Sequence, residues 1–240
     1  MGGVAMADQR RRELETSLAT VRARIASACT AAGRDPTEVT LVAVTKTYPA
    51  SDVEHLAALG VRDIGENRDQ EAAPKAREVA GAGVDVRWHF VGRLQRNKAR
   101  SVASYADLVH TVDGVRLADA LAEAARRADR VLDVLVQVSI DGDQARGGAA
   151  EEAGLEGVLA RVAESDALAL RGLMAIAPLD WEPDRAFATL AAIAEKVRAA
   201  HPSAAVLSAG MSDDMESAIR YGATHVRVGT ALLGNRPQLM

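Results

Sequence analysis

The chain has 240 residues, of which 48% are hydrophobic, and a formal net charge of −4 at pH 7. This acidic balance argues against general affinity for nucleic acid, and the single cysteine, Cys29, excludes an internal disulfide framework and is typical of a reducing compartment. Because no apolar run reaches membrane length and the amino terminus lacks the apolar core of a signal peptide, we expect a soluble, cytoplasmic protein.

Helical and strand patterns alternate through the first half of the chain. Residues 8–32 carry apolar side chains at three- and four-residue spacing and are followed by Gly33, which predicts an amino-terminal helix. The apolar run from Thr40 to Lys46 predicts a buried strand. Ser51 is expected to cap the next helix, which ends at Gly60. Further strands are predicted near 61–64, 86–91 and 108–112, and further helices over 68–80, 94–104 and 115–128.

The second half continues the same alternation. Strands are predicted at 131–138, 170–176, 205–207 and 225–228, and helices over 150–164, 184–200 and 212–221. Alternation of this kind indicates parallel βαβ units, and eight such units close a TIM-type (β/α)8 barrel. An open, doubly wound sheet is the alternative, but eight strands would make it unusually wide for this length. No linker marks a boundary, so we expect one domain over 1–240, with an amino-terminal helix over 1–33 and the barrel over 38–236.

In such a barrel, the residues that follow each strand face one common mouth. Lys46 lies at the carboxyl end of the first predicted strand. An amine at a strand end beside apolar walls can have a lowered pKa, which makes it a nucleophile for aldehydes. The alternative is a solvated lysine at a strand end.

The loops after the last two predicted strands combine hydroxyl groups with glycines: Ser208, Gly210, Ser212, Gly229 and Thr230. Glycines allow the backbone to approach an oxyanion, and the loops after strands seven and eight are the usual phosphate site of this fold. The alternative is ordinary helix capping by Ser212, because the charges of Asp213 and Asp214 oppose phosphate.

A lysine and a phosphate site on one rim would suit a ligand that carries both an aldehyde and a phosphate. Pyridoxal 5'-phosphate (PLP) is such a ligand, and it attaches to proteins as a lysine Schiff base. Arg227 lies inside the last predicted strand, where an inward arginine needs an acceptor. The ring nitrogen of PLP is one acceptor, and an arginine partner would leave it unprotonated. The alternative is an ion pair between Arg227 and a carboxylate across the barrel.

The same positions carry a family resemblance. The chain resembles the pyridoxal phosphate homeostasis proteins (the YggS/PROSC-type family), which share the fold of the alanine racemase amino-terminal domain. The matching segments run nearly end to end in the family's order: Val42–Lys46, Gly65–Asn67, Trp88–Gly92, Leu94-Gln95, Asn97-Lys98, Arg171–Met174, Gly210–Met215 and Arg227–Thr230.

The resemblance implies roles for individual residues. Lys46 would be the Schiff-base lysine, Asn67 would line the cofactor, and Arg227 would be the partner of the ring nitrogen. The residues expected near the phosphate are Ser208, Ser212, Gly229 and Thr230. Arg146 departs from the family, which often has lysine there, and an arginine cannot form the imine that a second lysine would form. Other departures are Arg68 for Tyr, Arg93 for Pro, Arg96 for Ser and Ala209 for Met.

The implied function is a non-catalytic PLP carrier in intracellular PLP homeostasis, with PLP-dependent apo-enzymes as possible recipients. The alternative is a PLP-dependent amino-acid racemase, which needs a second acid/base group opposite the lysine. A third hypothesis, a Schiff-base aldolase or phosphosugar enzyme, needs carboxylates at the mouth, for which Glu66 and Asp113 are the candidates.

The remaining polar residues suggest no further chemistry. The five histidines show no paired ligand spacing, so we expect no metal site, and His89 is interpreted as a hydrogen-bonded strand histidine. The basic run from Arg93 to Arg100 is interpreted as a solvated helix face. We expect no nucleic-acid or membrane partner, and a monomer or weak dimer.

Overall fold

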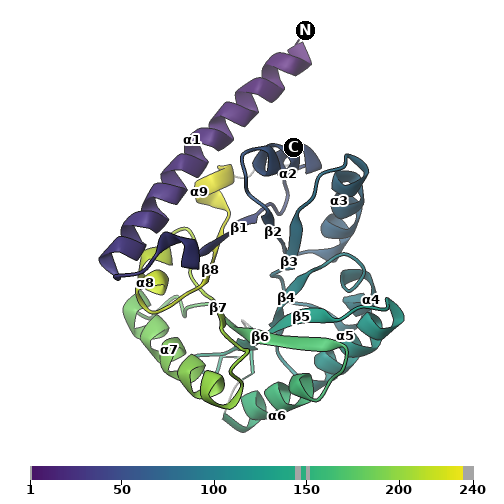
Figure 1. Ribbon diagram of the computed structural model, residues 1–240, viewed down its shortest axis with the longest axis vertical. Coiled ribbons are helices and arrows are strands. Elements are labelled where there is room, and N and C mark those ends of the chain that lie inside the picture. The colour runs from purple at the N-terminus through teal and green to yellow at the C-terminus, as the bar shows by residue number, and fades with distance from the viewer. Residues whose placement is uncertain (1, 144–146, 150–151, 235–240) are drawn as a thin grey trace.

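The computed structural model describes residues 2–143, 147–149 and 152–234. In these residues, eight parallel strands close into a barrel in which each strand pairs with the next and β8 pairs with β1 (Figure 1). The strands are β1 (Thr40–Val44), β2 (Asp63–Glu66), β3 (Arg87–Phe90), β4 (Leu108–Val112), β5 (Leu132–Val138), β6 (Leu168–Ala175), β7 (Val206–Ser208) and β8 (His225–Val228). The predicted TIM-type barrel is therefore confirmed.

Helices connect the strands and surround the barrel, as Figure 1 shows. They are α2 (Ala50–Ala58), α3 (Asp69–Gly81), α4 (Ala99–Val102), α5 (Val115–Arg127), α6 (Glu152–Ala163), α7 (Pro183–Ala200), α8 (Met215–Arg220) and α9 (Thr230–Leu233), with short 3₁₀ turns at Pro36–Glu38 and Arg96–Lys98. No helix in the described ranges is long and apolar enough to cross a membrane.

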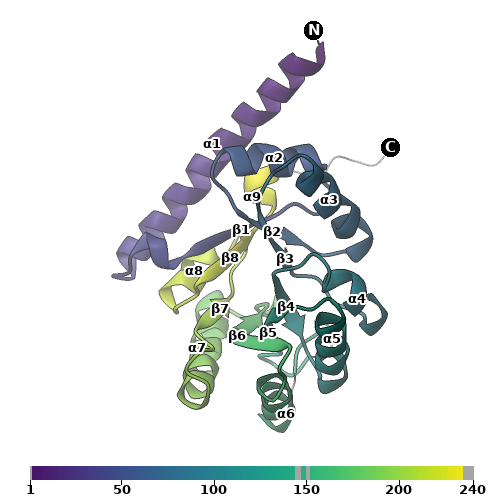
Figure 2. The same ribbon diagram turned by 45° about the vertical axis from the view of Figure 1, so that its right-hand side comes forward.

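An additional helix, α1 (Gly2–Ala31), lies outside the barrel, and its first turns extend past it (Figure 2). Its buried face is made of Leu14, Leu18, Val21, Ile25 and Cys29, which recur at helical spacing and pack against α2, α8 and α9. The helix thereby supports α8 and α9, the two elements that follow the last two strands of the barrel.

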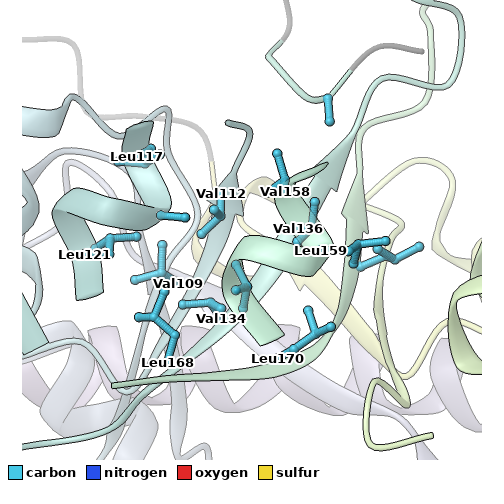
Figure 3. Close-up of a cluster of buried hydrophobic side chains, with 14 of the residues drawn as sticks. Val109, Val112, Leu117, Leu121, Val134, Val136, Val158, Leu159, Leu168 and Leu170 are labelled. Carbon is cyan, nitrogen blue, oxygen red and sulfur yellow. The ribbon is translucent and has the colours of Figure 1, made fainter. Parts of the chain in front are cut away.

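The main hydrophobic core lies between the sheet and the helices α4, α5, α6 and α7, and Figure 3 shows the part beside α5 and α6. Fully burying each aliphatic side chain of this kind contributes about 1.5–3 kcal/mol. The labelled side chains are Val109, Val112, Leu117, Leu121, Val134, Val136, Val158, Leu159, Leu168 and Leu170. This packing fixes β4, β5 and β6 and so defines one half of the barrel wall.

Several predicted boundaries were wrong. β1 ends at Val44, so Lys46 lies in the following turn, and α2 is preceded by Pro49 rather than capped by Ser51. Proline suits this place because the first N–H groups of a helix have no intrahelical partner. The predicted helix over 94–104 is a 3₁₀ turn followed by the short α4, and like charges four residues apart, such as Arg96 and Arg100, disfavour a longer helix.

Candidate functional site

Lys46 lies in a tight turn directly after β1. The Thr45 carbonyl oxygen accepts a hydrogen bond from the Tyr48 N–H at 3.1 Å, and Thr47 between them has a φ of +70°. A positive φ is strained for a β-branched residue, which is retained only where its surroundings hold it. The backbone of the half-buried Lys46 therefore has a fixed course at the carboxyl end of β1.

A buried ion pair supports this turn. Glu66 Oε1 accepts a hydrogen bond from Lys75 Nζ and another from Thr45 Oγ1 at 2.6 Å, and Lys75 also donates to the Thr45 carbonyl oxygen at 2.8 Å. Burial raises the pKa of Glu66, although the charge of Lys75 opposes the shift. Because Glu66 is fully enclosed, it holds Thr45 in place and does not supply the mouth carboxylate that an aldolase would need.

The loops after β7 and β8 are joined by a side chain. Ser212 Oγ accepts a hydrogen bond from the N–H of Ala231 at 3.4 Å. The helix predicted over 212–221 begins later, at Met215, and Asp214 precedes it, so the alternative of helix capping by Ser212 is not found. Asp214 instead accepts from the Met211 N–H at 2.6 Å, which closes the loop before the helix.

Gly210 allows this loop to pass close to α8. Its φ is +89°, and a Cβ there would lie 2.6 Å from the Cβ of Ala218. The Gly210 carbonyl oxygen accepts from the N–H of Arg227 at 3.0 Å, which ties the loop to β8. Gly229, at the end of β8, has more space, since a Cβ there would meet the Val44 carbonyl oxygen at an ordinary 3.5 Å.

Arg227 points into a buried polar environment. Its Nη1 donates to Ser208 Oγ at 2.7 Å and its Nη2 donates to the Ala175 carbonyl oxygen at 3.0 Å. Burial lowers the pKa of Arg227 to about 10, although the charge of Asp214 opposes the shift. The structure gives Arg227 no carboxylate partner within 4.0 Å among the described residues, so the alternative of an ion pair across the barrel is not found there. Two of its five N–H donors are used in these bonds.

The barrel brings the two predicted parts of the site to one rim. β1 and β8 pair with Ala43 opposite Val228, so Lys46 and Gly229 follow neighbouring strand ends. Both views show these strand ends side by side (Figures 1 and 2). Thr230 opens α9 and is exposed at the same rim.

Asn67 follows β2, the other neighbour of β1. Its side-chain Oδ1 is buried without a hydrogen-bond partner. Gly92 packs on the Asn67 backbone so closely that a Cβ there would overlap the carbonyl oxygen. Glycine at position 92 therefore allows the backbone at Asn67 to pass close to the end of β3.

An open cleft of about 1020 Å³ lies beside this rim, between the loops after β2, β3 and β4. Its lining includes Asn67 and the exposed Arg93, Arg96 and Arg116, but not Lys46 or the loops after β7 and β8. Arg146 lies outside the described residues. No cluster of three or more metal-binding side chains occurs in the part of the chain that the structure describes.

Two features of this region were not predicted from the sequence. Lys75 lies in the middle of α3, where a lysine ordinarily faces solvent. The Ser208 hydroxyl is fully buried between Arg227 and His110, so it lies inside the barrel and not in the loop beside the predicted phosphate site.

Comparisons with known proteins identify relatives along nearly the whole chain. Residues 16–237 match the family described as alanine racemase, N-terminal domain. The chain is 48% identical to the pyridoxal phosphate homeostasis protein of Mycobacterium tuberculosis, over 95% of this chain and 94% of the relative. It is 41% identical to the protein of the same name from Escherichia coli K12, over 93% of this chain and 97% of the relative.

Solved structures show the same fold. PipY from Synechococcus elongatus, solved with PLP bound, superposes with a TM-score of 0.80 and 34% identity, over 92% of this chain and 100% of PipY. An alanine racemase from Clostridium difficile superposes with a TM-score of 0.73 but only 14% identity, over 95% of this chain and 58% of the racemase. The second likeness concerns the fold alone.

Proposed function

The chain belongs to the pyridoxal phosphate homeostasis protein family, and from that premise we propose that it binds PLP as a Schiff base on Lys46. The observation that carries the proposal is the position of Lys46 beside the β8 end, next to the loops that Ser212 joins. On attachment, the lysine amine forms a bond to the aldehyde carbon, and the aldehyde oxygen leaves as water. When bound, PLP supplies an electron-withdrawing ring.

We assign the phosphate to the loops after β7 and β8. Ser212, Gly229 and Thr230 would offer hydroxyl and backbone N–H donors there, and Gly210 would hold the loop against α8. We do not assign Ser208 to the phosphate, because its buried hydroxyl already contacts Arg227 and His110.

The opposite side of the ligand would meet Arg227 and Asn67. Arg227 has further N–H groups that would donate a hydrogen bond to the ring nitrogen. Its guanidinium is buried and both of its partners are uncharged, so a further acceptor would be favourable. The unpartnered Oδ1 of Asn67 would accept from a hydroxyl of the ligand. The Arg227 donors and the Asn67 acceptor fit PLP, whose ring carries a nitrogen and a hydroxyl, better than a ligand without such ring groups.

Binding without catalysis is the second part of the proposal. A racemase needs a second acid/base group opposite the lysine. The hydroxyl of Tyr48 donates to the Gly234 carbonyl oxygen at 2.8 Å. Burial raises the pKa of Tyr105 well above its usual value. Tyr221 follows the carboxyl end of α8, which is the far end of the barrel from Lys46.

We therefore propose a cytoplasmic PLP carrier that acts as a monomer or weak dimer and supplies PLP-dependent apo-enzymes, with no nucleic-acid or membrane partner. Incubating the PLP-loaded protein with L-alanine in deuterated water separates this function from racemisation. A carrier gives no catalytic exchange of the α-proton, measured by NMR. Exchange over many turnovers, abolished by Lys46→Ala, would favour the racemase instead.

A further inference from the structure

A continuous line of hydrogen bonds crosses the interior of the barrel and ends at Arg227. Asp63 Oδ1 lies 2.9 Å from His89 Nε2, and His89 Nδ1 lies 2.9 Å from His110 Nε2. His110 Nδ1 lies 2.9 Å from Ser208 Oγ, which accepts from Arg227 Nη1 at 2.7 Å. We call these five side chains, which come from β2, β3, β4, β7 and β8, the Asp63–Arg227 line.

The line begins at the amino-terminal end of β2 and runs into the barrel interior. Asp63 is the first residue of β2, whereas Arg227 is the third residue of β8. Since β4 and β7 are not neighbours in the sheet, the contact between His110 and Ser208 crosses the barrel interior. His89, His110 and Ser208 are almost fully buried, while 19% of the Asp63 side chain is exposed. Among the five side chains, Asp63 is therefore the one that solvent reaches most readily.

The chemistry of the two ends gives the line a direction. A guanidinium only donates hydrogen bonds, and an ionised carboxylate only accepts them. Because Ser208 accepts from Arg227, its own hydrogen is directed to Nδ1 of His110. His110 must then carry its proton on Nε2 and donate to His89, which likewise carries its proton on Nε2 and donates to Asp63.

In this arrangement, each of the four hydrogen bonds has one donor and one acceptor, and both imidazoles are neutral. A second proton on His89 would reverse the link to His110 and leave the Ser208 hydrogen without an acceptor among its contacts. Burial lowers the pKa of His110, and the charge of Arg227 lowers it further. Burial opposes ionisation of Asp63, but the hydrogen bond with His89 and the charge of Arg87 lower its pKa overall.

We propose that Asp63, His89 and His110 are positioning residues for Arg227, an inference that rests on the proposed PLP site. With its hydrogen held by His110, the Ser208 hydroxyl turns its lone pairs toward Arg227. That bond and the one to the Ala175 carbonyl oxygen hold the guanidinium from two sides. The line orients Arg227 as outer carboxylates orient the histidines of metal sites. Asp63, at the start of β2, thereby influences the contact between Arg227 and the ring nitrogen of the ligand.

The existence of the line is tested without any ligand. Two-dimensional ¹H–¹⁵N spectra of the histidine-labelled full chain, with assignment by single histidine variants, report which ring nitrogen carries each proton. We expect both His89 and His110 to be neutral and protonated on Nε2. A doubly protonated imidazole at either position, or a proton on Nδ1 of either, overturns the directed line.

Its effect on the ligand is tested at Asp63, which is not among the proposed PLP contacts. Asp63→Leu removes the acceptor for His89, whereas the matched Asp63→Asn retains an acceptor and equally removes the charge near Arg87. We expect Asp63→Leu to weaken PLP binding roughly tenfold, the lower end of what outer partners give at metal sites, and to shift the absorbance of bound PLP. Asp63→Asn should bind within about twofold of wild type, because its amide oxygen still accepts.

The outcomes separate this inference from the proposed function. Failure of the wild type to bind PLP removes the function, while the histidine spectra still decide whether the line exists. Wild-type affinity and absorbance in a folded Asp63→Leu protein overturn the positioning role. If Asp63→Leu does not fold, Asp63→Ala gives the same comparison with Asp63→Asn.

Discussion

Lys75 and Glu66 form an ion pair enclosed by the protein, and the Lys75 ammonium also donates to the carbonyl oxygen of Thr45 at 2.8 Å. Thr45 immediately precedes Lys46, so this pair connects α3 to the turn that carries the proposed attachment site. The Lys75 side chain is 8% exposed and the Glu66 side chain is 0% exposed. Neither charge can therefore turn to solvent if its partner is removed.

Breaking this pair from one side should strongly destabilise the fold. We expect Lys75→Met to lower the free energy of unfolding by about 3–5 kcal/mol, because Glu66 is left as an uncompensated buried charge. Urea denaturation measures the change. The control is Arg127→Met, which removes one partner of the exposed Arg127–Glu123 pair and should change stability by no more than about 1 kcal/mol. Equal stability of the two variants would show that the buried pair does not support the fold.

Gly210 should be sensitive to any added side chain. Gly210→Ala places a methyl group against Ala218 at a φ of +89°, whereas Gly222→Ala has a similar φ of +92° but open space. The two variants share the backbone strain, so their difference isolates the close approach, which we expect to be about 1–3 kcal/mol in the free energy of unfolding. PLP affinity, measured by absorbance titration, should fall only for Gly210→Ala. Indistinguishable variants would mean that α8 moves to accommodate the loop.

Replacing Arg227 should separate binding from stability. Arg227→Met removes the donor for the ring nitrogen, so PLP binding should weaken and the absorbance of bound PLP should shift. The apo-protein should lose little stability or gain some, because a buried cation without a carboxylate partner is itself unfavourable by several kcal/mol. The matched control is Arg171→Met, which breaks the exposed pair with Asp133 on the outside of the barrel. Unchanged affinity and absorbance for Arg227→Met would place this residue outside the site.

Acid should destabilise the protein through buried histidines. Burial lowers the pKa of His225 to about 4 and lowers that of His110 well below its usual range. Unfolded histidines titrate near pH 6.5, so below that pH the unfolded chain binds protons that the folded chain does not. The stabilisation is therefore present above about pH 6.5 and is lost as the pH falls toward 4.

The test is urea denaturation at pH 7 and pH 5. His225→Gln should flatten the fall in stability between these values, while His201→Gln, in the loop after α7, should leave it as in the wild type. A wild-type fall in the His225→Gln protein would assign the acid sensitivity to other groups.

The sequence was sufficient to predict the barrel because strand and helix patterns are local. The bounds of β4 and β8 agree with those predicted, and the chain order of the strands is the order around the barrel. Boundaries set by turn chemistry were less accurate. α8 is shorter than predicted because the loop from Gly210 to Asp214 forms its own hydrogen bonds before the helix begins.

Contacts across the barrel could not be predicted in this way. Which inward side chains meet depends on the stagger of the strands, and no local pattern encodes that stagger. His89 was correctly expected to be hydrogen-bonded, but its partners Asp63 and His110 were not foreseen. Lys75 was missed for the same reason, since its acceptors lie on β2 and after β1. The single-domain assignment of residues 1–240 and the roles of the site residues remain predictions.

The covalent attachment point of PLP tests the central claim most directly. The full-length protein is mixed with PLP, reduced with borohydride, digested and analysed by mass spectrometry, in parallel with Lys46→Ala and the control Lys98→Ala. We predict that the added pyridoxyl phosphate is found on the peptide that contains Lys46, that Lys46→Ala loses both this adduct and the imine absorbance, and that Lys98→Ala retains both. An adduct on a different lysine in the wild type, or an unchanged absorbance band in Lys46→Ala, would contradict the proposed site.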